Sequence, residues 1–250
     1  HFNAKLPTMQ HSLHTDQGTG LVCEFRELAK KLAEYYGSYG VKVVPFHSPE
    51  LPHFSALPKP KQQAAVACLA AQWEIASLNI FNQVGADNNA KALWNALKVY
   101  GLVPSSDLFS KLESDDKIEV YTLDGIQVWR NLSVMELCSY TFEELHSYSW
   151  AECYHRADVD NAALFMAVGE LLKKNEKVGL FAGIPYHVVE EKFSQERLRL
   201  KVRHDYLFPL YNRDNAICAF VATSKAEELP KEKPLSSSRS FLNLVPNTTH

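Results

Sequence analysis

The sequence has no strong excess of charge of either sign and no long apolar run. Its 250 residues hold 26 Lys and Arg against 29 Asp and Glu, which gives a formal net charge of −3. A general nucleic-acid-binding surface needs surplus cations to neutralise phosphates, so we expect no direct nucleic-acid contact. A membrane-spanning helix needs about 18 consecutive apolar residues. The sequence has no such uninterrupted run, and we expect no membrane insertion.

Glycine and cysteine are also sparse. Ten glycines are too few to indicate a Gly-rich phosphate-binding loop, and GxSxG and HExxH motifs are missing, so the sequence predicts no catalytic residue. The odd number of cysteines and the lack of CxxC spacing argue against both a disulfide framework and a zinc ribbon. These cysteines are Cys23, Cys68, Cys138, Cys153 and Cys218. We expect no metal site, free thiols and a cytoplasmic protein, or a nuclear one in a eukaryote.

Apolar and aromatic residues are plentiful, at 46% and 11%, and support a sizeable core. Residues 1–20 are polar and predict a loosely ordered lead-in. Apolar residues recur at helical spacing from Leu21 to Tyr35, and helices are also predicted over 61–84 and 88–100. Five prolines between residues 45 and 60 indicate an extended connector. Residues 21–112 therefore read as a mainly helical region.

The second half has the pattern of a sheet interrupted by helices. Two β-rich runs around Ile118 and Val128 are separated by Asp124-Gly125, a strong hairpin signal. After a helical stretch that ends at Lys174, three extended runs cover 177–184, 198–211 and 216–223. Residues 225–250 predict a flexible tail. This order predicts an α+β fold, with a five-stranded antiparallel sheet and helices on one face.

Four segments in this order resemble a PAS domain, over about residues 115–224. They are Ile118–Asn131, Leu137–Leu145, His155–Asp158 and Pro209–Val221. Ser139 and Asn215 stand where the family usually has glycine. The resemblance implies a sheet wrapped around helices that often holds a small molecule. It also implies flanking helices that form a dimer contact, so we expect the Ala-rich helices over 61–100 to mediate dimerisation or relay a signal.

The same segments have structural roles that need no family. Asp124-Gly125 allows the positive φ of a tight turn. Asn131 can cap the helix that follows it, and Thr141 with Glu144 matches a capping box. These residues predict the fold rather than a ligand.

A small organic ligand in the apolar interior would be lined by residues from the strands and the long helix. The predicted lining is Val120, Val128, Leu164, Phe165, Val168, Phe181, Leu200, Phe208 and Phe220. The alternative is an ordinary packed core made by the same residues. The sequence disfavours flavin, since the Asn-Cys-Arg segment of light sensors is missing. It also disfavours haem, because we expect His155 at a helix start and His187 in a loop, so any cofactor is unknown.

Residues 185–197 look like an insertion between two strands. The following residues alternate between apolar and basic, with Arg197, Arg199, Lys201 and Arg203 on one side and His204 next to them. This alternation predicts a half-buried strand whose basic face either receives an acidic partner or is solvated.

The sequence therefore favours a regulatory module of a signalling or transcription-regulatory protein. Its PAS-like domain would bind a small apolar ligand or a protein partner, and a homodimer is expected. Two alternatives stay open: an interaction scaffold with a solid core, and a small-molecule-binding enzyme or effector that uses the same fold.

Overall fold

The computed structural model describes residues 19–174 and 176–230, and it is an α+β fold. Most of the predicted lead-in and the end of the predicted tail lie outside these residues. The helices are α1 (Thr19–Ser38), α2 (Pro52–Ser55), α3 (Lys59–Phe81), α4 (Asn89–Tyr100), α5 (Leu132–Met135), α6 (Phe142–Ser147), α7 (Trp150–Cys153) and α8 (Asp158–Lys174). The strands are β1 (Val103–Pro104), β2 (Lys117–Thr122), β3 (Gln127–Arg130), β4 (Tyr154–His155), β5 (Leu180–Glu191), β6 (Arg199–Tyr211) and β7 (Ile217–Glu228).

The three long N-terminal helices are confirmed, and local sequence explains their ends. In α1, buried Phe25, Ala29, Leu32 and Tyr36 recur every three or four residues and form one apolar face. Helix α4 begins after Asn88, whose side chain accepts a hydrogen bond from the Lys91 amide. The sequence predicted the helical spacing of α1, whereas the Asn88 cap is seen only in the structure.

Helix α3 differs from the sequence expectation in one respect. The helix is long and apolar enough to cross a membrane. One third of its most apolar 18-residue segment is buried inside the protein. It packs against α1 and α4. A core helix of a soluble protein passes the same test of length and composition.

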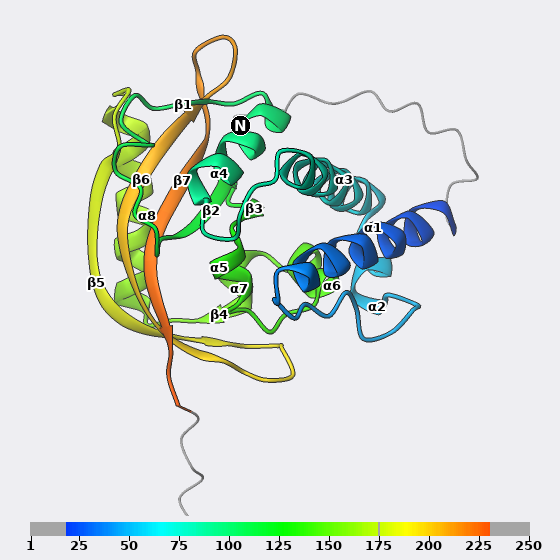
Figure 1. Ribbon diagram of the computed structural model, residues 1–250. Helices are drawn as coiled ribbons and strands as arrows, with labels where there is room; N and C mark the ends of the chain where they lie inside the picture. Colours follow the sequence, from blue (N-terminus) through cyan, green and yellow to red (C-terminus); the bar gives the residue numbers. More distant parts are fainter. Residues whose placement is uncertain (1–18, 175, 231–250) are drawn as a thin grey trace, which may run out of the picture.

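The strands form one curled antiparallel sheet with the order β3-β2-β7-β6-β5-β4, and β1 pairs with β6 (Figure 1). The sheet thus has seven strands, not the five predicted. The two extra strands, β1 and β4, have only two residues each, too few for an alternating pattern to be visible in a sequence.

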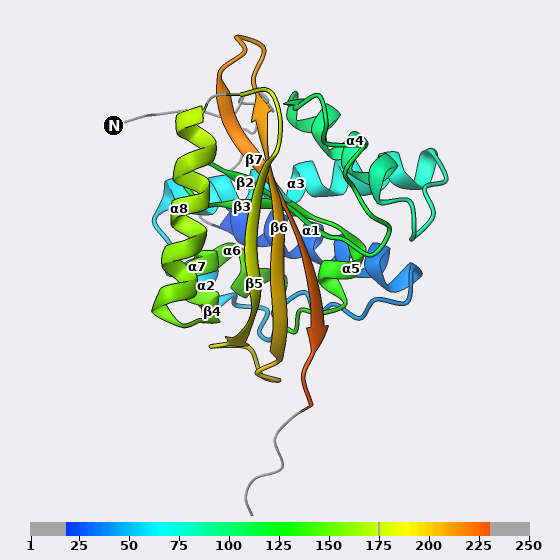
Figure 2. The same cartoon turned by 90° about the vertical axis from the view of Figure 1, so that its left-hand side faces the viewer.

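Helices cover both faces of this sheet, so the prediction of helices on one face was wrong. Figure 2 shows α8 on one side of the sheet and α3 and α4 on the other. We call these sides the α8 face and the α4 face. In β7, Ala219 and Val221 belong to the core on the α4 face, whereas Phe220 and Ala222 belong to the core on the α8 face. A central strand that is apolar on both sides needs a cover on each.

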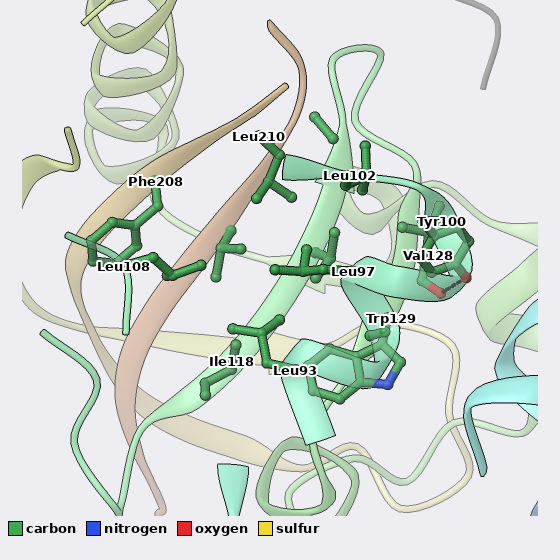
Figure 3. Packing of buried hydrophobic residues seen from close by; sticks show 14 of the residues in the cluster. Leu93, Leu97, Tyr100, Leu102, Leu108, Ile118, Val128, Trp129, Phe208 and Leu210 are labelled. Carbon is green, nitrogen blue, oxygen red and sulfur yellow. Dashed lines mark hydrogen bonds between the residues drawn. The ribbon is translucent and has the colours of Figure 1, made fainter. Parts of the chain in front are cut away.

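The core on the α4 face joins the helical region to the sheet. Leu93 and Leu97 of α4 pack against Ile118, Phe208 and Leu210 of the strands (Figure 3). A second core cluster joins α1 and α3 to α5 and α6, and includes Phe25, Leu69, Met135 and Phe142. The helices and the sheet therefore share their cores.

Strand β5 and strand β7 are longer than predicted. Strand β5 runs to Glu191, so half of the predicted insertion over 185–197 is strand, and β7 runs to Glu228, into the predicted tail. Strand β5 shifts register twice against β6, close to Gly183, which has φ +58°, and to Pro185. Glycine and proline are strand-breaking signals in a sequence. For this reason the predicted strand stopped at residue 184, before Pro185.

Candidate functional site

The nine residues predicted to line a ligand pocket are spread over several places. The core on the α4 face contains Val120, Val128 and Phe208. The core on the α8 face contains Leu164 and Phe220, with Val168 packed against it. A smaller cluster at the far end of β5 and β6 contains Leu200. The two remaining residues, Phe165 and Phe181, are exposed. The structure thus brings together three of the nine on the α8 face and three on the α4 face.

A different set of side chains, mostly polar, meets on the α8 face beyond the end of the apolar core. We call this set the polar cluster: Glu119, Tyr121, Arg130, Tyr154, Arg156, His187 and His204. Alternation in the strands brings it together, because Glu119 of β2 pairs with Arg130 of β3, and His204 of β6 lies beside β5. Arg156 precedes α8 and reaches the cluster from the helical side.

Two histidines form one side of the polar cluster. Their rings stack with centroids 5.5 Å apart, and both side chains are buried. Arg156 Nε donates to His187 Nε2 at 3.2 Å, and His187 Nδ1 lies 3.0 Å from the carbonyl oxygen of Pro185. His187 thus has a partner for each ring nitrogen. It lies in β5, so the prediction that it sits in a loop was wrong.

His204 has no such partners. It is only 7% exposed, and neither ring nitrogen has a hydrogen-bond partner among the described residues. Burial, with the nearby Arg156 charge and His187, lowers the pKa of His204 to about 3. A neutral imidazole has one donor and one acceptor, and leaving both unpaired in a protein interior costs free energy.

On the side of the cluster formed by β2 and β3, hydrogen bonds link the side chains to one another. Arg130 Nη2 donates to Gln127 Oε1, and Gln127 Nε2 donates to Glu119 and, at 3.1 Å, to the hydroxyl of Tyr121. Burial lowers the pKa of Arg156, whereas for Arg130 burial is outweighed by Cys138, Tyr154, Glu119 and Tyr121, and its pKa is raised. Both guanidinium groups thus lie near Glu119 and remain charged at neutral pH.

The strand between these two sides carries small side chains on the α8 face. Ala222 of β7 lies opposite Glu119 of β2, and Ser224 lies opposite His204 of β6. Both small residues are buried, Ala222 at 6% and Ser224 at 4% exposed, so other side chains cover the centre of this face.

Two other polar regions need separate mention. A cavity of about 20 Å³ lies between α1, α3 and β3, and buried amides such as Asn79 and Asn131 line it. It has room for about one water molecule.

Among the described residues, Glu113, Asp115 and Asp116 could hold a metal ion. The ammonium group of Lys225 contacts all three and lies 2.8 Å from Glu113 and from Asp116. A lysine thus already compensates these carboxylates.

The predicted basic face of β6 lies on the side of the strand opposite His204, and it is largely neutralised. Arg199 pairs with Glu190, Lys201 with Glu227, and Arg203 with Asp205. His204, which follows them, points to the buried side with Leu200 and Val202. Strict counting of alternate residues from Leu200 would have placed His204 inside, and this was the signal that the sequence analysis missed.

Comparisons with known proteins do not add a family. No family model matches the sequence, and no characterised protein matches it. The resemblance to a PAS domain therefore stays a prediction that rests on the four segments described above.

Proposed function

We propose that this chain is a regulatory sensory module with a PAS-like domain that binds a small polar molecule at the polar cluster. The succession of elements supports the PAS-like reading: a hairpin (β2 and β3), then helices, then three long strands that return to pair with β2. The site lies beside the start of α8, on the face of the sheet where the resemblance implies a ligand.

The observation that carries the proposal is the ring of His204, whose two nitrogens have no hydrogen-bond partner within the described part of the chain. A buried polar group without a partner costs about 1–3 kcal/mol, and a ligand that donates to one nitrogen and accepts from the other removes this cost.

Hydrogen-bond donors dominate the cluster, which favours an acceptor-rich ligand. Arg130 and Arg156 each carry five N–H groups, against the carboxylates of Glu119 and, near Arg156, Asp160. A small carboxylic acid fits this lining better than the apolar ligand that the sequence suggested, because guanidinium groups bind carboxylates through paired hydrogen bonds.

The sheet itself provides a route from the ligand to the helices. Neighbouring residues of β6 and β7 contact opposite faces, so a shift of these strands at the polar cluster also moves the residues packed on α4. Such a change could alter how the helical region meets a protein partner, which is the regulatory output that we propose.

The test combines native mass spectrometry with thermal unfolding in the presence of small mono-, di- and tricarboxylic acids. We expect a retained mass that disappears on denaturation, or a rise in Tm with at least one acid. The variant His204→Phe should lose this response. The free protein should nevertheless become about 1–2 kcal/mol more stable to urea, because the unpaired nitrogens are gone.

The exposed His155 provides the control, and His155→Phe should change neither the ligand response nor the stability. A wild-type protein without retained mass or ligand response, together with an unchanged stability of His204→Phe, would contradict the proposal. It would favour an interaction scaffold with a solid core.

A further inference from the structure

Helix α8 has an exposed apolar face opposite the face that it buries. Leu164, Ala167 and Leu171 pack on the sheet, whereas on the outer side Val159 is 73% exposed and Met166 67%. Phe165 and Leu172 are also exposed, at 59% and 37%. Figure 2 shows α8 at the edge of the molecule, with its outer side away from the sheet and from the other helices.

These residues fall into one stripe along the helix. Val159, Ala162, Met166 and Gly169 are spaced by three or four residues, as are Ala162, Phe165, Gly169 and Leu172. Such spacing keeps side chains on one side of a helix, as in the seam of a coiled coil. The stripe extends from Val159 to Leu172 of this 17-residue helix, which is about 20 Å. A face of this kind packs against another helix.

The charges of α8 indicate which helix that is. Its first turn carries Asp158 and Asp160, and its last turn carries Lys173 and Lys174. A second α8 that runs antiparallel brings the acidic end of each copy to the basic end of the other. A parallel copy would bring like charges together, which is unfavourable.

The apolar residues follow the same symmetry. Suppose that two antiparallel copies of α8 cross midway between Phe165 and Met166. Val159 of one copy then lies opposite Leu172 of the other, and Ala162 lies opposite Gly169. The same arrangement places Asp158 opposite Lys173. A twofold interface requires this kind of self-complementary surface, because each patch must meet a copy of itself.

We propose that this chain forms a homodimer in which two α8 helices pack antiparallel, with Met166 near the centre. The interface consists of one helix from each copy and is therefore small. Interfaces of this size give weak complexes, so we expect a dimer that dissociates on dilution. This interface is separate from the dimer contact through helices 61–100 that the sequence suggested.

The first experiment is sedimentation velocity over a series of protein concentrations. We expect the wild-type protein to shift from monomer to dimer, and Met166→Glu to raise the dissociation constant about tenfold or more, since it places two like charges at the centre. Phe81→Glu is the matched control: it also charges an exposed apolar residue, but at the end of α3. It should dimerise like the wild type.

Both substitutions are at exposed positions, and circular dichroism should confirm that each variant is folded. Three results would overturn the proposal. One is a wild-type protein that stays monomeric at the highest concentrations. The others are a dimer unaffected by Met166→Glu and a dimer lost in Phe81→Glu, which would place the contact on α3.

A charge swap and a cross-link test the antiparallel arrangement. Asp158→Lys and Lys173→Glu should each weaken the dimer, and the double variant should restore it. In a background with Cys23→Ser, which removes the exposed native thiol, mild oxidation should link Ala162→Cys to Gly169→Cys when the two variants are mixed. Efficient linking of either cysteine variant to itself alone would show a parallel pair and contradict the model.

Discussion

Two histidines, the half-buried His146 and the buried His204, have strongly lowered pKa values. Burial and the charge of Arg130 lower the pKa of His146 to about 3, and burial, Arg156 and His187 do the same for His204. An unfolded chain binds protons at these sites near the ordinary histidine pKa of about 6.5. Below that value the unfolded state therefore holds more protons than the folded state, and acid favours unfolding.

The sign of this linkage gives a prediction. The free energy of unfolding should fall as pH drops from about 6 to about 4, by about 1.4 kcal/mol per pH unit for each of the two histidines. Urea unfolding at a series of pH values measures this slope. The variant His204→Phe should show a slope smaller by about 1.4 kcal/mol per unit. An equal slope in both proteins would mean that His204 takes up a proton in the folded state.

Asn131 shows how much of a single residue's role the sequence reveals. The sequence predicted that it caps a helix, and its side chain does accept from the Val134 amide at 3.3 Å. The same side chain also accepts from the Ile118 amide and donates to Asn89 and to the carbonyl oxygen of Asp116. The cap depends on neighbours in the chain and is visible locally, whereas the other contacts exist only in the folded protein.

At the scale of elements, the short helix α2 depends on a distant side chain. The carboxylate of Glu143, on α6, accepts hydrogen bonds from the backbone amides of His53 and Phe54 at 2.8 and 3.2 Å. Glu143 is buried, so these bonds are shielded from water. They fix the proline-rich stretch, which contains the short helix α2 rather than being extended throughout as predicted, onto the sheet-bearing half of the chain.

We expect Glu143→Ala to destabilise the protein by about 1–3 kcal/mol, because it removes the acceptor of two N–H groups in a buried setting. Glu143→Gln keeps one oxygen and should cost less. Urea unfolding gives both values, and limited proteolysis should cut Glu143→Ala faster between residues 45 and 58. Equal stability of the alanine variant and the wild type would show that water replaces the carboxylate.

The elements differ in how well the sequence predicts them. Helix α6 begins with the predicted capping box of Thr141 and Glu144, and α8 ends at Lys174 as predicted. The ends of β5 were not predictable, since its two register shifts allow Pro185 inside a strand. The polar cluster was missed for a similar reason: its members come from β2, β3, β5, β6 and the segment before α8, and only the fold brings them together.

At the scale of the whole molecule, the helices on the α4 face are part of the core of the sheet. Without α1 to α4, the side chains of Val120, Val128, Leu210 and Val221 lose their cover. The sequence could not show this, because alternation marks an apolar side of a strand but not which helix covers it.

A chain that begins at residue 113 should therefore fail to form a stable fold. We expect low soluble yield, binding of a hydrophobic dye and no cooperative thermal transition, in contrast to the full chain. Circular dichroism and a dye assay on the two proteins make the comparison. A soluble fragment with cooperative unfolding would contradict the shared core.

The irregular course of β5 has a consequence for concentrated solutions of the protein. Gly183 has a positive φ, Pro185 has no amide hydrogen, and the strand shifts register twice. The edge of β5 that faces away from β6 is therefore poorly suited to pair with a strand from another chain. Another chain cannot easily extend the sheet there. Folded protein should thus tolerate long storage at high concentration without seeding fibrils, and any precipitate formed on heating should originate from unfolded chains.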